Sequence, residues 1–578
     1  MRRALLAALA LVGMAGSVTA GAADLDGRGL AEGRASSSDR HPGLAPASTS
    51  PHSYRAMDVR NGGFRTKSGM TELGAGGALP SATGAVFLRT QEPIAANAGG
   101  RDPGLQPPQE HVAAAPVART SLGSVRGTSA GGHLVFRGLP YAAPPLGPRR
   151  FAPPAPPARW PGVRDAAAAA PACTQQDYTW NRADYLHQSE DCLTLDVGTE
   201  ALTGRRPVLV WIHGGANYAG SPGDMAESPI VARGIVMVGV RYRLGALGFL
   251  HHRTAGGGSL ATQDQIAALR WVRENIARFG GDPDRVTIAG ESAGAQDVGL
   301  LVAAPAARGL FRRAIMESGT PGFGLPWRSR EEALRLGDQV DDALGARGDA
   351  AAMRSVAAWP LLVAGETTHD QLLTDDSYRW LRTTVDGIVF PEGPDRLLAA
   401  APGVDVLIGT NRIELDLPGG HTRRDAFVAL SYPGQEAGAR RFYRLDHPEP
   451  RADPADRDGT RDQRIATDAT FRCPAQRFAA TMRGRGGKVW RYLFDGSATG
   501  APTRHALEIP FIYADQPLGQ LHLIDYWANF VKTGDPNGTG LPSWPAADAA
   551  QTYLALDAAG ARAAVPPAED VCRLGDSL

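Results

Sequence analysis

Short apolar runs alternate with a helical pattern in the middle of this chain, and that alternation restricts the fold more than any other feature. Three runs have the length and apolar content of buried strands: RPVLVWIH (206–213), GIVMVGVRYR (234–243) and RVTIAG (285–290). Between the second and the third, Leu269, Val272 and Ile276 recur at the spacing of one helix face. Further strands are predicted at 403–409 and 488–494, and a long helix at 518–532. Alternating strands and helices indicate an α/β fold with a large, mostly parallel central sheet and helices on both faces.

The pattern G-x-S-x-G, typical of a nucleophilic serine on a tight turn, occurs twice in the chain. By itself it is weak evidence, because 70 of the 578 residues are glycine. Ser292, in GESAG, follows a predicted strand and opens a helical stretch, so we expect its hydroxyl above the carboxyl edge of the sheet. Ser129, in GTSAG, lies in a predicted hairpin with no helix after it. The context therefore favours Ser292, with glycines beside it where backbones pass too closely for a Cβ atom.

A nucleophilic serine needs a base, a group that orients the base, and N–H donors for the developing oxyanion. When the serine sits on a strand-to-helix turn, the acid and then the histidine follow it along the chain. The histidines far enough after Ser292 are His421, His447, His505 and His522. His505 is favoured because it lies in the loop that follows the strand predicted at 488–494, and a surface loop histidine is the alternative.

The acid and the oxyanion donors are predicted from the ends of two other strands. Glu414 lies a few residues past the strand at 403–409, with Asp416 as the alternative acid. Gly215 and Ala216 follow the strand at 206–213, and Ala293 follows the nucleophile, so their backbone N–H groups are the expected oxyanion donors. An ordinary glycine turn is the alternative interpretation of the first two.

The N-terminal part of the chain differs in composition from the rest. Arg2 and Arg3, a short apolar run and small residues after it are typical of a secretory signal peptide, assigned to residues 1–22. The run is too short for a stable membrane span, so we expect a secreted or periplasmic protein. Residues 23–113 are rich in Gly, Ala, Ser and Pro and are expected to be disordered, whereas 114–578 form the folded domain.

The whole chain has 60 Lys and Arg against 60 Asp and Glu, so it has no excess of basic residues for nucleic-acid binding.

Export makes disulfides the expected state of the four cysteines, with buried free thiols as the alternative. Four cysteines allow three pairings, and these stay open on spacing alone. A bond between Cys173 and Cys192 would close a short loop, and one between Cys473 and Cys572 would tie the C-terminal tail to the body.

Several separate motifs from about Thr120 to Cys572 resemble the type-B carboxylesterases, the α/β-hydrolase group that includes cholinesterases and lipases. They are FRGLPYAAPPLGPRRFAPP (136–154), SEDCLTLDV (189–197), VWIHGGANYAGS (210–221), YRLGALGFL (242–250), DQIAALRWVRENIARFGGDPDRVTIAGESAGA (264–295), RHALEIPFIY (504–513) and WANFVKTGDPN (527–537). The resemblance implies an α/β-hydrolase fold with a helical cap around an active-site gorge. It also implies hydrolysis of a small-molecule ester with no metal or organic cofactor.

The resemblance further implies roles for individual residues. It matches the Ser-Glu-His triad to Ser292, Glu414 and His505, and a family disulfide to Cys173 with Cys192, which makes Cys473 with Cys572 the natural second pair. Arg150 and Glu190 match a buried ion pair that holds the N-terminal loop. Ser318 matches a serine that hydrogen-bonds near the triad, and Glu291 is expected to lie with it behind the triad.

The chain departs from the family pattern at three places. Asn217 follows Ala216 where the family has an aromatic residue, so a more polar acyl pocket is expected. Trp180 resembles the cation-binding tryptophan of cholinesterases at a different spacing, and is expected to anchor a loop instead. The span from Glu414 to His505 is short, so the cap is expected to be trimmed.

The alternatives to a serine esterase are an inactive adhesion or binding protein and an amidase or lactonase with the same triad. The oligomeric state is left open.

Overall fold

The computed structural model describes residues 115–449, 457–496, 502–567 and 570–577. Contact clustering separates residues 18–112 from the rest of the chain, and these residues lie wholly outside the described ones. The segments expected as a signal peptide (1–22) and as a disordered stretch (23–113) lie outside them as well. All described residues belong to one compact unit.

Within the described residues, eleven strands form one sheet in the order β20-β19-β18-β17-β14-β13-β9-β10-β8-β4-β3. Their bounds are β3 (Thr128–Ala130), β4 (His133–Pro140), β8 (Thr194–Thr199), β9 (Arg206–Ile212), β10 (Val236–Val240), β13 (Gly281–Glu291), β14 (Arg313–Glu317), β17 (Asp405–Asn411), β18 (Val489–Asp495), β19 (Tyr553–Asp557) and β20 (Gly560–Ala564). The strands from β10 across to β19 run parallel, and both edges of the sheet are antiparallel. The prediction of a large, mostly parallel central sheet is confirmed.

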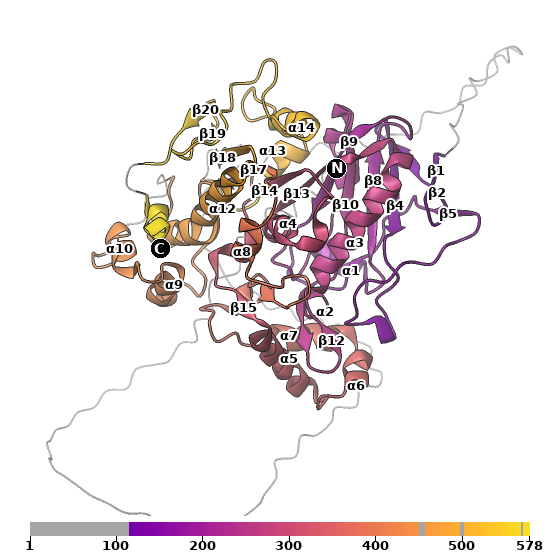
Figure 1. Ribbon diagram of the computed structural model, residues 1–578, viewed down its shortest axis with the longest axis horizontal. Helices are drawn as coiled ribbons and strands as arrows, with labels where there is room; N and C mark the ends of the chain where they lie inside the picture. The colour runs from indigo at the N-terminus through magenta and orange to yellow at the C-terminus, as the bar shows by residue number, and fades with distance from the viewer. Residues whose placement is uncertain (1–114, 450–456, 497–501, 568–569, 578) are drawn as a thin grey trace, which may run out of the picture. The chain divides into compact units, whose positions relative to one another are not determined.

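Helices cover both faces of this sheet (Figure 1). The α-helices referred to are α3 (Leu260–Asn275), α4 (Ala293–Ala303), α5 (Arg330–Leu344), α6 (Ala350–Ser355), α7 (Ala358–Glu366), α8 (Pro394–Ala399), α11 (Arg461–Ala466), α12 (Cys473–Gly484), α13 (Ile509–Tyr513) and α14 (Leu523–Thr533). Val208 and Val210 of β9 pack in one core with α3, α4 and α12, whereas Leu209 and Trp211 pack in the other with α13 and α14. Successive strand residues point to opposite faces, so a continuous apolar run is what a strand buried on both faces requires.

The C-terminal helix α14 begins later than the sequence predicts, at Leu523 rather than at 518. Leu518 and Leu521 instead exchange backbone hydrogen bonds of 2.8 and 3.0 Å across a short turn. Both leucines are buried in the same core as the helix, so the apolar pattern continues across a break in the helical backbone.

Both expected disulfides are present, and within the described residues no cysteine is free. Cys173 and Cys192 are 19 residues apart, and Cys473 and Cys572 are 99 residues apart. Closing loops of these lengths stabilises the folded state by roughly 3 and 5 kcal/mol on the chain-entropy model. The second bond holds the C-terminal turn η10 (Val571–Ser577) against α12.

The expected ion pair of the N-terminal loop is also formed. Arg150 Nε donates to Glu190 Oε2 at 2.8 Å, and both side chains are largely buried. Arg150 Nη1 also donates to the carbonyl of Arg354, at 3.1 Å, so the guanidinium joins the loop to the segment around α6.

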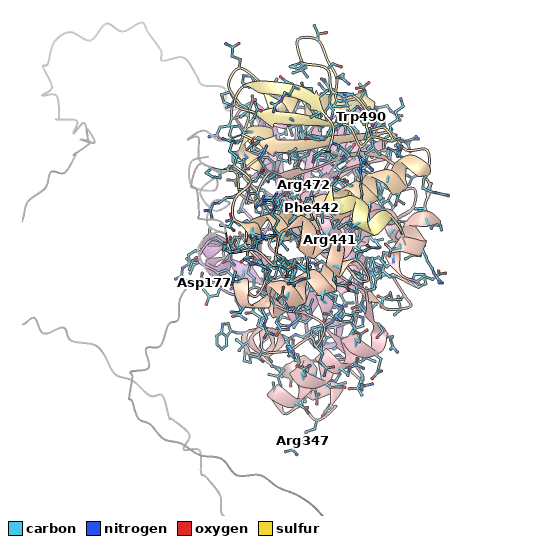
Figure 2. The ribbon with its side chains drawn as sticks, turned by 90° about the vertical axis from the view of Figure 1, so that its left-hand side faces the viewer. Asp177, Arg347, Arg441, Phe442, Arg472 and Trp490 are labelled. Carbon is cyan, nitrogen blue, oxygen red and sulfur yellow. A yellow bond between two sulfur atoms is a disulfide. The ribbon has the colours of Figure 1, made fainter. Side chains whose placement is uncertain are left out.

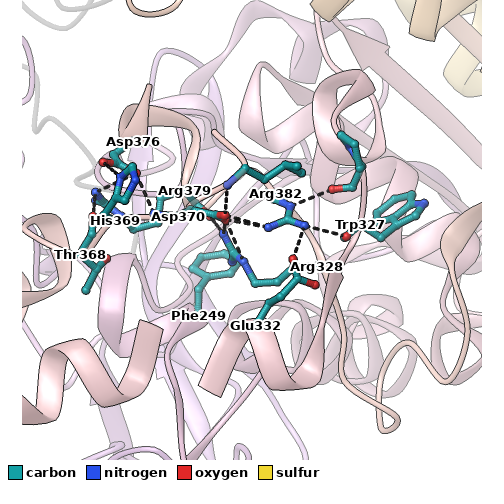
Figure 3. Close-up of polar contacts among 12 residues, drawn as sticks. Phe249, Trp327, Arg328, Glu332, Thr368, His369, Asp370, Asp376, Arg379 and Arg382 are labelled. Atoms are coloured by element: carbon teal, nitrogen blue, oxygen red, sulfur yellow. Dashed lines mark hydrogen bonds and ion pairs between the residues drawn. The ribbon is translucent and has the colours of Figure 1, made fainter. Parts of the chain in front are cut away.

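A second buried ion cluster holds the helices inserted between β14 and β17 (Figure 3). The carboxylate of Asp370 lies 2.5 Å from Arg328 Nη2 and 2.9 Å from Arg382 Nη1. Arg382 also pairs with Glu332 of α5 at 2.8 Å. Asp370, Arg328 and Arg382 are each at most 6% exposed, so one carboxylate lies between two guanidinium groups away from water, and Glu332 gives Arg382 a second, less buried partner.

Replacement of Asp370 by asparagine should therefore destabilise the protein by about 3–5 kcal/mol, because buried Arg328 loses its charge partner and Arg382 keeps only Glu332. Denaturant unfolding of the two proteins, followed by circular dichroism, measures the difference. The matched control is Asp338→Asn, which removes an exposed partner of Arg253 and should cost less than about 1 kcal/mol. Equal free energies of unfolding for the two variants would show that the buried charge of Asp370 does not stabilise the protein.

Candidate active site

Ser292 lies on a tight turn between β13, which ends at Glu291, and α4, which begins at Ala293. Its backbone has φ 58° and ψ −125°, a region that L residues seldom adopt. The turn is held on both sides, because the Ser292 N–H donates to the carbonyl of Glu317 at 2.8 Å and its carbonyl accepts from Gln296 at 3.0 Å. The surroundings thus hold a strained conformation that projects the hydroxyl from the end of the strand.

The glycines of GESAG are required by close backbone contacts. A Cβ atom on Gly290 would lie 2.5 Å from the backbone of Gly294. A Cβ atom on Gly294 would lie 2.1 Å from the carbonyl oxygen of Ile212, at the end of β9. Any side chain at either position would push the turn away from the neighbouring strand.

The three residues predicted as a triad lie in one hydrogen-bonded row. His505 Nε2 lies 2.8 Å from Ser292 Oγ, and His505 Nδ1 lies 2.7 Å from Glu414 Oε2. His505 and Glu414 are 4% and 2% exposed, which shields the row from bulk water. The geometry suits transfer of a proton from the serine to the imidazole while the carboxylate holds the ring.

The loop after β17 orients the Glu414 carboxylate. Its Oε1 accepts the backbone N–H of Asn411 at 2.7 Å, which leaves Oε2 for His505. The Glu414 N–H donates to Thr467 Oγ1 at 3.1 Å, and the His505 N–H donates to the Glu414 carbonyl at 3.1 Å. The alternative acid, Asp416, is exposed and instead accepts from Gln463.

The other candidate histidines lie elsewhere. His421 and His522 are exposed and face the carboxylates of Asp462 and Asp515. His447 is exposed in the turn before residue 450.

The loop after β9 lies directly against the serine. A Cβ atom on Gly214 would lie 3.1 Å from Ser292 Cβ, and Gly215 and Ala216 have positive φ values of 105° and 54°. Within the described residues, the N–H groups of Gly215 and Ala216 donate to no protein acceptor, and that of Ala293 is the first in α4. Free N–H groups at a helix start and a neighbouring turn suit a developing oxyanion.

Buried carboxylates surround the triad. Glu291 Oε1 lies 3.2 Å from His505 Nε2, and Ser318 Oγ donates to Glu508 Oε1 at 3.3 Å. Asn411 Nδ2 donates to Glu508 Oε2 at 2.6 Å, so one asparagine contacts both Glu414, through its backbone, and Glu508. Sequence reasoning placed Glu291 and Ser318 behind the triad but missed Glu508 and Asn411. Glu508 lies in the motif RHALEIPFIY, which was the only signal for it.

The charges of Glu291 and His505 depend on each other. Burial opposes a charged imidazole, yet the carboxylates of Glu291 and Glu414 raise the pKa of His505 to about 9. Burial raises the pKa of Glu291 to about 8, against the opposing effect of His505. Because each charge stabilises the other, a negative Glu291 favours the protonated imidazole.

A cavity of about 280 Å³ opens beside the loop after β9. Trp180 lines it together with Gly215 and Ala216, and a Cβ atom on Gly215 would lie 3.0 Å from the Trp180 ring. The expectation that Trp180 only anchors a loop is therefore incomplete. The anchor is its neighbour Asn181, whose amide nitrogen donates to Gln175 Oε1 at 2.8 Å.

The expectation that Asn217 makes the acyl pocket more polar is wrong. Asn217 is 0% exposed, and its amide nitrogen donates to the carbonyl of Trp380 at 3.2 Å. Its side chain therefore lies in the core, away from the cavity that its neighbour Ala216 lines.

Across the described ranges, no group of three or more His, Cys, Asp or Glu side chains is placed to hold a metal ion. In the same residues no helix combines the length and the apolar character that a membrane crossing needs.

Comparison with known proteins places the chain in a family. The model of the carboxylesterase family matches residues 114–573. The para-nitrobenzyl esterase of Bacillus subtilis (strain 168) is 35% identical over 465 residues, which cover 74% of this chain and 92% of that protein. Human cocaine esterase is 33% identical over 502 residues, covering 76% and 86%. A para-nitrobenzyl esterase structure superposes with a TM-score of 0.68 at 32% identity, covering 78% of this chain and 97% of the other. The chain therefore belongs to the carboxylesterase family and is a carboxylic-ester hydrolase.

Proposed function

We propose that this protein hydrolyses carboxylic esters through an acyl-enzyme intermediate on Ser292. His505 takes the hydroxyl proton as Oγ attacks the ester carbonyl, and Glu414 stabilises the imidazolium that forms. The N–H groups of Gly215, Ala216 and Ala293 hold the oxyanion. His505 then gives its proton to the departing alcohol, and water repeats the sequence to release the acid.

The observation that carries the proposal is the continuous row of hydrogen-bonding contacts from Glu414 through His505 to Ser292. A fluorophosphonate probe tests it, because such a probe labels only a serine activated by a base. Mass spectrometry of the digested protein should find the label on the peptide that contains Ser292. A protein that stays unlabelled while folded would instead fit the inactive binding protein. A series of p-nitrophenyl esters of rising acyl length then measures which acyl groups the site accepts.

We also propose that the protein acts after export, in a secreted or periplasmic form. The signal-like segment at 1–22 and the two disulfides support this, since disulfides persist in oxidising compartments. N-terminal sequencing of the mature protein should find its first residue close to position 23. A mature protein that begins at Met1 in the cytoplasm would contradict the proposal.

Replacement of Glu291 by glutamine should move the acid limb of the kcat/KM profile to lower pH, by about one unit. The protonated imidazole cannot accept the serine proton, so activity falls as the pH drops through the pKa of His505. Removal of the Glu291 charge lowers that pKa, because this charge raises it. The matched control is Glu331→Gln on the exposed face of α5, which should leave the limb in place. An unmoved limb in both variants would show that His505 does not sense Glu291.

A further inference from the structure

A second and larger cavity, of about 760 Å³, lies between the ends of β17 and β18, α11, α12 and the C-terminal turn η10. None of the triad or of the proposed oxyanion donors lines it. Two of its lining residues, Phe442 and Arg472, are labelled in Figure 2. The arginines around it are Arg412, Arg444, Arg461, Arg464, Arg472 and Arg491, against three aspartates, Asp458, Asp468 and Asp570. Among the described residues, Arg412 pairs with Asp458 and Asp495, Arg461 with Glu449, and Arg472 with Asp468. Arg444, Arg464 and Arg491 form no such ion pair there, and Asp570 is the remaining lining carboxylate, so positive charge is in excess.

Arg491 on β18 is the most constrained of these arginines. It is 7% exposed, and its Nη1 donates to the carbonyl of Gln551 at 2.6 Å. Its guanidinium lies 5.9 Å from the ring centre of Tyr553, and within the described residues no carboxylate oxygen lies within 4 Å of it. Burial lowers the pKa of Arg491 to about 10. The charge of Asp570 acts on Arg491 from beyond ion-pair distance and only partly offsets this burial. A buried cation without a direct ion pair is costly, and an anion in the cavity would supply one.

Two further arginines have donors without acceptors. The Nε atoms of Arg464 and Arg472 are both buried and, in the described part of the chain, have no hydrogen-bond partner. The other two nitrogens of Arg472 are engaged: Nη1 donates to Asp468 Oδ1 at 2.5 Å, and Nη2 donates to the carbonyl of Arg412 at 3.0 Å. Arg464 forms no ion pair with any described carboxylate. Asp468 neutralises Arg472 and Asp458 pairs with Arg412, so neither of these acids is left to pair with Arg464.

We infer that this cavity binds a phosphate group, free or carried by a small organic molecule. Planar guanidinium groups donate in pairs to the oxygens of a phosphate, which makes arginine the side chain best suited to this anion. A doubly charged phosphate matches the excess of lining cations better than a single carboxylate. The cavity is larger than a bare phosphate needs, and the rings of Phe442 and Tyr553 lie on its wall, which suits an organic phosphate with an apolar part.

Binding should be measured directly rather than through turnover. Thr410 and Arg412, which line the cavity, flank Asn411, the residue whose N–H holds Glu414. An occupant could therefore change the rate of ester hydrolysis in either direction. Failure of the phosphate site and failure of the esterase proposal stay distinguishable, because the first is a binding result and the second a labelling result.

Isothermal titration of the full chain with inorganic phosphate, and separately with phenyl phosphate, tests the inference. Each should bind saturably, and each should raise the melting temperature beyond sodium chloride of equal ionic strength. Arg491→Gln should weaken binding about tenfold or more, as should Arg464→Gln, which serves if the first variant does not fold. The matched control is Arg396→Gln on α8, a side chain that is 83% exposed, and its affinity should stay as in the parent protein.

The affinities of the two probes separate the two sources of the phosphate group. Tighter binding of phenyl phosphate assigns the site to an organic phosphate, whereas equal or weaker binding assigns it to the inorganic ion. Heat changes and melting temperatures no different from those in sodium chloride would overturn the inference. Unchanged phosphate affinity in both Arg491→Gln and Arg464→Gln would overturn it too.

Discussion

Replacement of Ser292 by alanine should lower kcat for p-nitrophenyl esters by about 10⁵-fold or more. The substitution removes the oxygen that forms the acyl bond, and neither the imidazole of His505 nor the backbone donors can replace it. The fold should persist, because the turn at 292 is held by backbone hydrogen bonds to Glu317 and Gln296 and not by the hydroxyl. Steady-state kinetics on the two proteins, with circular dichroism for the fold, make the measurement.

The chain supplies its own matched control in the second G-x-S-x-G. Ser129 is exposed on β3, in a strand that pairs antiparallel with β4. Ser129→Ala should keep the full rate, and the fluorophosphonate label should remain on the Ser292 peptide. Near-parental turnover in the folded Ser292→Ala protein would remove Ser292 from the mechanism.

Replacement of Glu414 by glutamine should lower kcat by about 10⁴-fold with little change in structure. Oε1 of Glu414 accepts the N–H of Asn411, so the oxygen of a glutamine keeps that place and its NH₂ group faces His505. An NH₂ group in that position donates to Nδ1, which leaves the ring proton on Nε2. The imidazole is then a donor toward Ser292 Oγ and cannot take its proton.

Asp416→Asn is the matched control for this prediction. Asp416 is two residues from Glu414, is exposed and bonds to Gln463, so its loss should change kcat less than about threefold. A reversed outcome, with Asp416→Asn the slower enzyme, would make Asp416 the acid and contradict the geometry.

Much of the fold could be predicted from short stretches of sequence. A strand buried on both faces needs an apolar run. β9 and β10 lie within the runs predicted for them, and β17 overlaps its predicted run and extends two residues past it, to Asn411. The start of α14 could not be predicted in this way, because Leu518 and Leu521 are buried just as helix residues are. Their backbones pair across a turn, and side-chain polarity does not report that difference.

In the candidate site, too, some residues could be predicted from the sequence and others could not. Ser292, Glu414 and His505 could be predicted to meet because each follows a strand of the sheet, and the carboxyl ends of parallel strands lie at one edge. Asn217 was misjudged because its buried amide donates to the carbonyl of Trp380, which lies 163 residues further along the chain. Glu508 was missed because its role comes from Ser318 and Asn411, which precede it by 190 and 97 residues.

The sequence by itself determined where the backbone must turn sharply, which strands are buried and which hydroxyl stands at the end of one of them. These are local properties, set by glycine, by apolar period and by the order of elements along the chain. Only the tertiary structure decided which polar groups are buried next to one another, away from solvent. The link between the pKa values of Glu291 and His505, and the unpaired charge of Arg491, both arise from burial by segments distant in the chain. Desolvation is a property of the whole packed interior, and so no single stretch of residues carries it.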